Sequence, residues 1–246
     1  MKKIIASLTI LILYFQLSAI DTIQPVLLNV VAPSGLKLRA TPNMNAEVLY
    51  IIPAKSVVSL VDNELFPPVE DEINYIIGSW VYVNYEGEEG YVFDGFLSKL
   101  PVPIHEFEMT QNYLNLIYPL ESWMEYHNLG LNSVDTFSSS LYNKTVFSYD
   151  NGNSMVQKNT TSQYILSVEL ENVKIWDAYH LLNNMLNSRN ERSSFKNNSL
   201  FIANKRGQIN KIKIELEEPI LITQQENGNI TIEIKSFSKG CHIDLT

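Results

Sequence analysis

Short runs of alternating apolar and polar residues, each ended by a turn signal, dominate residues 33–101. Alternation at a period of two predicts strands with one buried face. Many short strands separated by Gly or Pro turns indicate a small barrel or sandwich. The runs cover 36–39, 48–52, 57–61, 80–85 and 91–93. The predicted core positions are Leu36, Leu38, Val81, Val83 and Val92.

Three segments of this region resemble the bacterial SH3 (SH3b) domain family. Residues 35–43, GLKLRATPN, resemble its opening G-L-N-V-R-x-x-P, and residues 80–92, WVYVNYEGEEGYV, resemble its closing W-x-x-V-x-x-x-G-x-x-G-W/Y-V. Phe96-Leu97-Ser98 is similar to its final Y-L. The resemblance covers residues 33–101 and implies a partly open, SH3-like β-barrel. It also implies a binding module of exported proteins, with a cell-wall peptide or an envelope protein as partner.

Residues 63–79 depart from the family pattern, because this segment is longer than the pattern needs. It contains Phe66-Pro67-Pro68 and the acidic run 70–72. We expect it to form a loop that lies over or beside any binding groove.

Aromatic residues of the same region are candidate ligand contacts, because there are more rings than a core of this size can hold. Rings at a surface suit recognition, but packing against a second domain or over a barrel edge is an equal alternative. The five residues are Trp80, Tyr82, Tyr85, Tyr91 and Phe93. Arg39 is expected to bind a turn carbonyl or an acid, and Gly87 and Gly90 to permit the positive φ of a tight turn.

Residues 106–246 form a second predicted domain, of the α+β class, after the stiff exit Pro101-Val102-Pro103. The predicted helices are a short one capped by Thr110, one from Pro119 to about 127, and one over 175–186. The predicted loops are 131–143, which is rich in Ser, and the polar run 187–194 that ends the last helix. The predicted strands are 145–149, 164–170, 211–216, 221–223 and 230–234, the last two joined by an Asn-Gly turn. We expect an antiparallel sheet with helices on one face and recognise no family here.

The first nineteen residues have the pattern of a secretory signal peptide. Lys2 and Lys3 precede an apolar run over 4–17, and Ala19 offers a small residue at a cleavage site. An uncleaved anchor is the alternative, but it needs roughly 20 apolar residues to span a bilayer. We therefore expect residues 1–19 to be removed and the protein to be exported, periplasmic or extracellular, with no integral membrane segment after cleavage.

The charge balance excludes one large class of partner. The chain has 18 Lys and Arg against 27 Asp and Glu, for a net charge of −9. Binding to a nucleic acid requires clustered cations, so no nucleic-acid partner is expected. The single cysteine rules out both an intrachain disulfide and a Cys-rich zinc site.

No arrangement of residues in the sequence forms a recognisable catalytic or metal site. Cys241 and His242 are adjacent, but only four residues follow them, and we expect an inert thiol. The histidines lack the spacing of a helical metal site. Carboxylate pairs that a glycosidase can use occur at 106 and 108, at 169 and 171, and at 217 and 218. We expect these carboxylates to be solvated, and we expect no catalytic residue, metal or cofactor.

These features together predict an exported, non-catalytic binding or adaptor protein. Its SH3b-like module would recognise a cell-wall peptide, a glycopeptide or an envelope protein. Two alternatives stay open at this point. One is a cell-wall hydrolase with catalytic residues in the C-terminal domain, and the other is a structural subunit of an envelope assembly.

Overall fold

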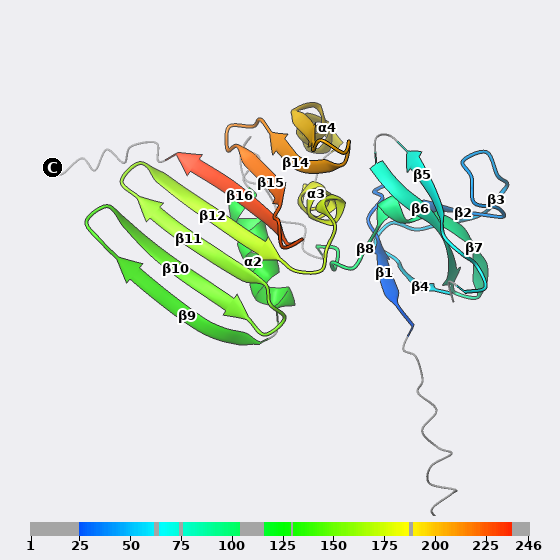
Figure 1. Cartoon of the computed structure of the whole chain (residues 1–246), viewed down its shortest axis with the longest axis horizontal. Helices are drawn as coiled ribbons and strands as arrows, with labels where there is room; N and C mark the ends of the chain where they lie inside the picture. Colours follow the sequence, from blue (N-terminus) through cyan, green and yellow to red (C-terminus); the bar gives the residue numbers. More distant parts are fainter. Residues whose placement is uncertain are drawn as a thin grey trace, which may run out of the picture.

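The structure is a computed structural model that describes residues 25–61, 64–73, 76–103, 116–128, 130–186 and 189–237. Two antiparallel sheets dominate these residues, one formed before residue 100 and one after residue 130 (Figure 1). The chain is therefore mainly β, as its alternating runs predict. The predicted signal peptide, 1–19, lies outside the described residues. Within the described ranges, no helix combines the length and the apolar character needed to cross a membrane.

The first sheet has the strand order β3-β2-β7-β6-β4-β1-β8, and β5 pairs with β6 beside this path. The described end strands β3 and β8 do not pair with each other, so the sheet is open and the expected barrel stays a prediction. The sheet also begins at Leu27, ahead of the expected boundary at residue 33. Its elements are β1 (Leu27–Val30), β2 (Leu36–Arg39), β3 (Val48–Ile52), β4 (Val57–Leu60), β5 (Val69–Ile73), β6 (Ile76–Tyr85), β7 (Glu88–Phe93), the 3-10 helix η1 (Asp94–Phe96) and β8 (Leu97–Ser98).

The core of the first sheet is the one that the alternation predicts. Side chains that point to one face of β2, β6 and β7 meet in a single buried cluster, together with side chains of β1, β3 and β4. The predicted members Leu36, Leu38, Val81, Val83 and Val92 all belong to it. Burying such a side chain fully is worth about 1.5–3 kcal/mol, so these positions account for much of the stability of this sheet.

Two turn predictions are confirmed and one is wrong. Arg39 Nη1 donates to the carbonyl oxygen of Ala46 at 2.7 Å, as expected. Gly87 has a φ of 95° in the turn between β6 and β7. Gly90 does not have a positive φ; instead, a Cβ at this position would lie 2.8 Å from the carbonyl oxygen of Arg39. Gly90 is therefore required for the close approach of β7 to β2.

Residues 63–79 are not the long loop that was expected. In their described part, Val69–Ile73 form β5, which pairs antiparallel with the first half of β6 from Ile76 to Trp80. The acidic run lies on β5, where Asp71 Oδ2 accepts the indole N–H of Trp80 at 2.8 Å. This hydrogen bond lowers the pKa of Asp71. The segment extends the sheet because β6 is long enough to provide it with a partner.

The second sheet consists of two successive units, each a helical segment followed by four strands. The last strands of the units, β12 and β16, pair with each other, which gives the order β13-β14-β15-β16-β12-β11-β10-β9. The first unit is α2 (Ile117–His127), β9 (Leu131–Ser138), β10 (Tyr142–Tyr149), β11 (Ser154–Thr160) and β12 (Gln163–Leu170). The second is α3 (Ile175–Asn184), α4 (Arg189–Asn197), β13 (Ser199–Ala203), β14 (Ile209–Ile214), β15 (Ile220–Gln224) and β16 (Ile230–Phe237).

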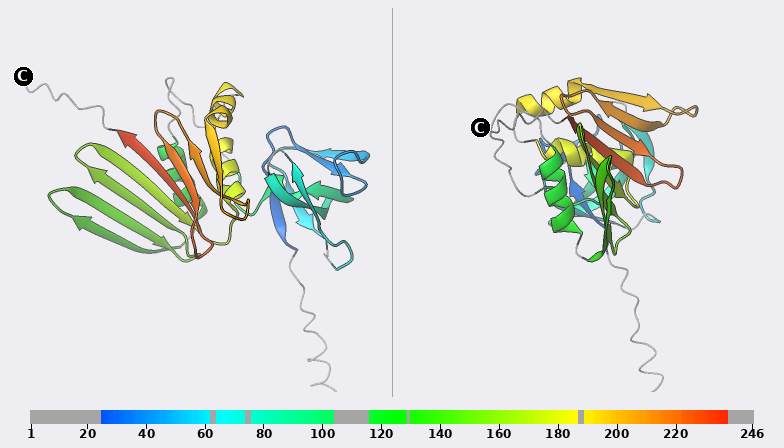
Figure 2. Two further views of the ribbon diagram at one scale, coloured as in Figure 1. Left: turned by 45° about the horizontal axis from the view of Figure 1, so that its top comes forward. Right: turned by 90° about the vertical axis from the view of Figure 1, so that its left-hand side faces the viewer.

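One face of the second sheet is buried, as an antiparallel sheet with helices on one face requires. Leu166, Val168 and Leu170 of β12 pair with Ile234, Ile232 and Ile230 of β16, and all six side chains are buried. The helices contribute to the same cluster, and they lie on one side of the sheet (Figure 2). The predicted hairpin of residues 221–223 and 230–234 is confirmed by the pairing of β15 with β16.

Two segments predicted as loops are regular elements. Residues 131–138 form the edge strand β9, with every side chain exposed, so its regularity comes from pairing with β10 and not from burial. Residues 189–197 form α4, in which the described buried side chain is Phe195. A single buried ring in a polar run leaves almost no hydrophobic period to detect. The helix that Thr110 was predicted to cap lies outside the described residues.

Candidate functional site

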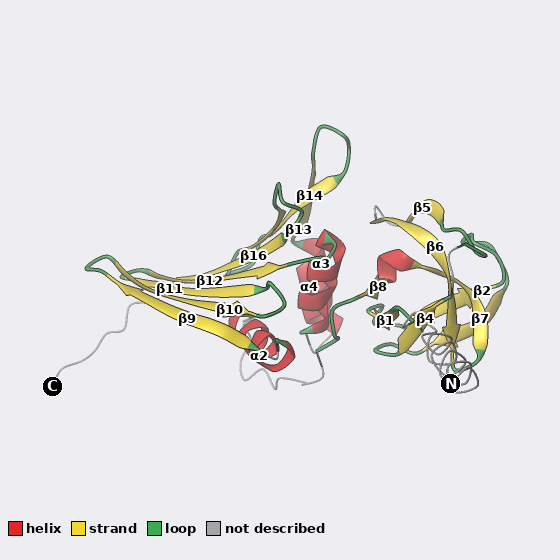
Figure 3. Ribbon diagram, turned by 60° about the horizontal axis from the view of Figure 1, so that its bottom comes forward, coloured by secondary structure: helices red, strands yellow, loops and turns green. Residues whose placement is uncertain are grey.

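Helix α3 joins the two sheets. Asp177, His180 and Asn184, spaced by three and four residues, form a polar stripe along it. His180 Nε2 lies 3.1 Å from the carbonyl oxygen of Gly95 in η1. The side-chain amide of Asn184 donates to the carbonyl oxygen of Val31 at 3.0 Å. The stripe therefore contacts the first sheet where β1 and β8 pair, and Figure 3 shows α3 and α4 between the two sheets.

The first turn of α3 adds an ion pair and a buried carboxylate to this contact. Lys174 Nζ lies 2.7 Å from Asp94 Oδ2 in η1. Asp177 accepts hydrogen bonds from the backbone N–H of Lys174, at 2.7 Å, and from the hydroxyl of Ser98 in β8. Desolvation raises the pKa of Asp177, although its hydrogen bonds act in the opposite direction. Exposed ion pairs and buried polar pairs both gain little net energy, so we assign to these contacts the orientation of α3 on the first sheet.

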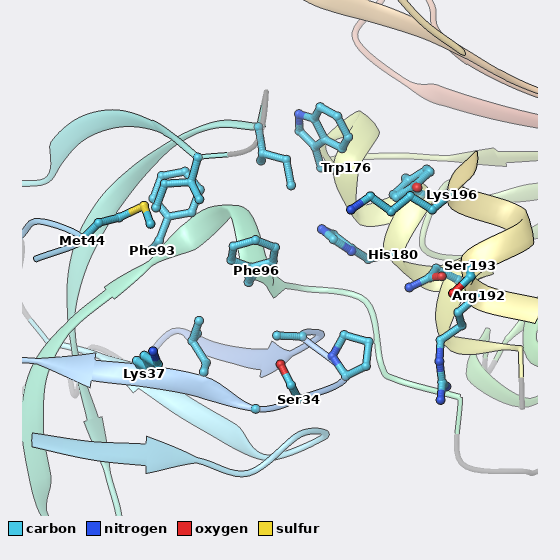
Figure 4. Close-up of a pocket in the computed structure, with 18 of the residues that line it drawn as sticks. Ser34, Lys37, Met44, Phe93, Phe96, Trp176, His180, Arg192, Ser193 and Lys196 are labelled. Atoms are coloured by element: carbon cyan, nitrogen blue, oxygen red, sulfur yellow. The ribbon is translucent and has the colours of Figure 1, made fainter. Parts of the chain in front are cut away.

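Beside α3 lies a cavity of about 840 Å³, which we call the inter-sheet cavity (Figure 4). Both sheets supply its walls, and aromatic rings dominate each wall. Its size falls within the range of about 300–1,000 Å³ of small-molecule pockets. On one wall the ring centroids of Trp176 and Phe201 are 5.4 Å apart. On the other wall the ring centroids of Trp80 and Phe93 are 5.9 Å apart. The aromatic lining residues are Trp80 and Phe93 of the first sheet with Phe96 of η1 on one side, and Trp176 and Tyr179 of α3 with Phe201 of β13 on the other.

The charged residues in the described lining of the inter-sheet cavity are all cationic. Lys37 and Arg39 belong to β2, and Arg192 and Lys196 belong to α4. No Asp or Glu is among the described lining residues. Both guanidinium groups are anchored by a backbone carbonyl, Arg39 by Ala46 at 2.7 Å and Arg192 by Leu186 at 2.9 Å. The two lysines are exposed, so their ammonium groups can meet a ligand.

His180 supplies a buried hydrogen-bond acceptor to the cavity. Its Nε2 faces a carbonyl oxygen, which only accepts, so Nε2 carries the proton and Nδ1 has a free lone pair. Nδ1 is buried and has no hydrogen-bond partner in the part of the chain that the structure describes. Desolvation lowers the pKa of His180 to about 4, and the bond to Gly95 only partly opposes this. The imidazole is therefore neutral at physiological pH, and Nδ1 keeps an unused lone pair in a residue that lines the cavity.

The five aromatic residues singled out by the sequence do not form one exposed patch. Trp80 and Phe93 are paired across β6 and β7 and are only 3% and 2% exposed, so they form part of the cavity wall. Tyr82 and Tyr91, the next pair along the same face, are half-buried and pack with Phe66 in a separate group. Tyr85 lies on the opposite face of β6 and packs beside Tyr50. Strand alternation thus divides the rings among three environments.

The second half of the cavity was missed by the sequence analysis. Trp176 and His180 lie on α3, and Lys196 lies on α4. Helical spacing identifies Ile175, Tyr179 and other apolar positions of α3 as core, but it does not reveal what the polar side of the helix contacts. The cavity is formed by segments about 80 or more residues apart, and no short motif reports such a pairing.

The candidate catalytic residues do not come together in the described part of the chain. Cys241, His242 and the pair 106 and 108 lie outside it. Glu169 is bound to the side chain of Asn229 at 2.7 Å on the second sheet. The pairs 169/171 and 217/218 are not part of the cavity lining. Across the described ranges, no group of three or more His, Cys, Asp or Glu side chains is placed to hold a metal ion.

Comparisons with known proteins identify no relative: the chain matches no family model, and neither a curated protein nor a solved structure is significantly similar to it.

Proposed function

We propose that this chain is an exported, non-catalytic binding protein whose ligand lies in the inter-sheet cavity. The first sheet would be an SH3b-like module, and the second sheet with its helices would provide the other wall of the site. The observation that carries the proposal is the cavity itself, because its aromatic lining comes from both sheets. Concave sites with apolar walls and a few polar groups are typical of ligand binding.

The SH3b assignment draws support from the position of its motifs. The opening motif lies on β2, and the closing motif lies on β6 and β7. These three strands are neighbours in the order β2-β7-β6, and their inward residues share one core. The open path of the sheet is compatible with the partly open barrel of that family. Cavity residues Lys37 and Arg39 lie within the opening motif, and Trp80 begins the closing motif.

Binding is favoured over catalysis by the bonds of the cavity residues. A serine nucleophile needs a base within hydrogen-bond reach, and Ser34 and Ser193 are the lining serines. His180 contacts neither serine, because Nε2 is bound to Gly95 and Nδ1 has no partner. We therefore assign to His180 a role in holding a ligand.

The proposed ligand is a peptide or glycopeptide fragment of the cell wall. Indole and phenol rings stack on apolar side chains and on the apolar faces of sugars, and the cavity has such rings on both walls. An envelope protein is the competing partner. Binding to purified wall material distinguishes the two, because a protein partner would be recovered only from an envelope extract.

Removing the Trp176 ring is expected to weaken binding of wall material at least about tenfold, because buried aromatic residues dominate binding energy. Trp176 lines the cavity from α3. The measurement is co-sedimentation of the protein, from residue 20 onward, with purified wall material. The matched control is Phe237→Ala, which removes an exposed ring at the end of β16.

Equal binding by Trp176→Ala and the wild type would place the ligand elsewhere. A lytic band in a zymogram, lost on Cys241→Ser, would replace binding by hydrolysis.

Export predicts that the mature protein begins at Ile20. Expression of the full chain in a bacterium, followed by N-terminal sequencing of the envelope fraction, tests this directly. Cleavage after Ala19 removes Lys2 and Lys3 and makes the protein more acidic. Recovery of the protein from the cytoplasm with residues 2–19 intact would contradict export.

A further inference from the structure

We infer that the inter-sheet cavity selects an amphiphilic anion, that is, a ligand or ligand segment with an apolar body and one acidic group. This inference rests on the proposed function, since it names the chemistry of the ligand at the same site. The apolar body would lie between the aromatic walls, and the acidic group would lie beside one of the two exposed lysines of the lining, Lys37 or Lys196.

The first argument is the charge of the lining. The whole chain has more acids than bases, 27 against 18. The described lining of the cavity reverses this balance, with four cations and no carboxylate. Apolar walls exclude water and strengthen the field of nearby charges. The protein as a whole therefore repels an anion, whereas the cavity lining attracts it.

The second argument is the placement of the cations. Lys37 lies on β2 of one wall and Lys196 on α4 of the other, so each wall offers a cation to an acidic group. In Figure 4 the Lys196 side chain extends from α4 into the space beside Trp176 and His180. Neither lysine is in an ion pair with a described residue. Arg39 and Arg192 each use one donor on a carbonyl, which leaves further N–H groups for the ligand.

The third argument is the interior of the site. Ile73, Ile76 and Met44 add aliphatic surface to the aromatic walls. His180 contributes a neutral ring on the inner side, so no fixed charge lies beside the apolar body of the ligand there. The site therefore combines an apolar interior with cationic side chains. A neutral apolar ligand would leave the cations unused, and a small inorganic anion would leave the rings unused.

Two fluorescent probes that share one aromatic body test the inference. 1-Anilinonaphthalene-8-sulfonate carries an acidic group, and N-phenyl-1-naphthylamine is the same ring system without it. We expect the wild type to bind the sulfonate about tenfold more tightly than the neutral probe. In Lys37→Gln/Lys196→Gln, we expect the affinity for the sulfonate to fall about tenfold and the affinity for the neutral probe to be unchanged.

The matched control is Lys205→Gln/Lys213→Gln, which changes the net charge equally at exposed lysines outside the cavity lining. It is expected to leave both affinities unchanged. Competition with dodecanoate and with dodecyl phosphate then distinguishes a carboxylate ligand from a phosphate ligand, because the better match displaces the sulfonate probe at lower concentration.

Two results would overturn the inference and leave the proposed function intact. One is equal affinity of the wild type for both probes. The other is an equal loss of affinity for both probes in Lys37→Gln/Lys196→Gln. Either result would show an apolar site without charge selection. Failure of both probes to bind the wild type would instead count against the cavity as a ligand site, and thus against the proposed function.

Discussion

Replacing Gly95 by Ala is expected to destabilise the contact between the two sheets by about 2–3 kcal/mol, the cost of overpacking a filled site. Gly95 is buried in η1, and its carbonyl oxygen is the partner of His180 Nε2. A Cβ here would overlap the ring of Phe93 and lie 2.7 Å from Ile76 Cγ2. Both neighbours are themselves buried. η1 must therefore move away from its present position, which breaks the bond to His180 and distorts the cavity wall.

Denaturant unfolding of Gly95→Ala measures this cost, and the sulfonate probe reports the loss of the site. The control is the double variant Gly95→Ala/Phe93→Leu, in which the overlapping ring is absent. Its destabilisation should be smaller than the sum of the two single changes, because the second substitution relieves the overlap of the first. Additive effects, or a Gly95→Ala protein as stable as the wild type, would refute the packing described for η1.

Lowering the pH from 7 to 4 is expected to remove about 3 kcal/mol of stability through His180 alone. The folded protein keeps this imidazole neutral until about pH 4 because the ring is desolvated. The unfolded chain takes up the proton near pH 6.5. The unfolding free energy contributed by His180 is therefore complete above pH 6.5, and it falls as the pH decreases towards 4.

His180→Gln isolates this effect, because a side-chain amide can still donate to the carbonyl oxygen of Gly95 but does not titrate. The change in unfolding free energy between pH 7 and pH 4 should be smaller in this variant than in the wild type by about 3 kcal/mol. Asp177, whose pKa is raised, acts in the opposite direction, but it is common to both proteins and cancels in the difference. His127→Gln, on α2, is the matched control. The same pH dependence in His180→Gln and the wild type would refute the burial of a neutral His180.

The sequence predicts those parts of the fold that have a regular hydrophobic period. Leu36, Leu38 and Val81 were assigned to the core correctly, because alternation reports which face of a strand is buried. The helix predicted over 175–186 is present as α3, Ile175–Asn184, because its apolar residues recur at the helical period. Strand β9 was missed, because every side chain in it is exposed and pairing with β10 determines its conformation.

The site was only partly predictable, because a cavity between distant segments has no local signature. Trp80 and Phe93 were recognised as excess rings, but their burial depends on cross-strand pairing and on the approach of α3. Tyr82 and Tyr85 were grouped with them, although alternation alone places Tyr85 on the other face of β6. Lys196 follows the polar run 187–194 and has no role that the sequence alone indicates; only the approach of α4 to the first sheet gives it one.

The three indole N–H signals of the protein test most directly whether a ligand lies between the two sheets. Trp80 and Trp176 line the inter-sheet cavity, and Trp123 lies on α2 with its N–H bound to the carbonyl oxygen of Pro101. In a titration of ¹⁵N-Trp-labelled mature protein with solubilised wall fragments, followed by NMR, the signals of Trp80 and Trp176 should shift together to saturation. The Trp123 signal should stay in place. Saturable binding that leaves Trp80 and Trp176 unshifted would contradict a ligand site between the sheets.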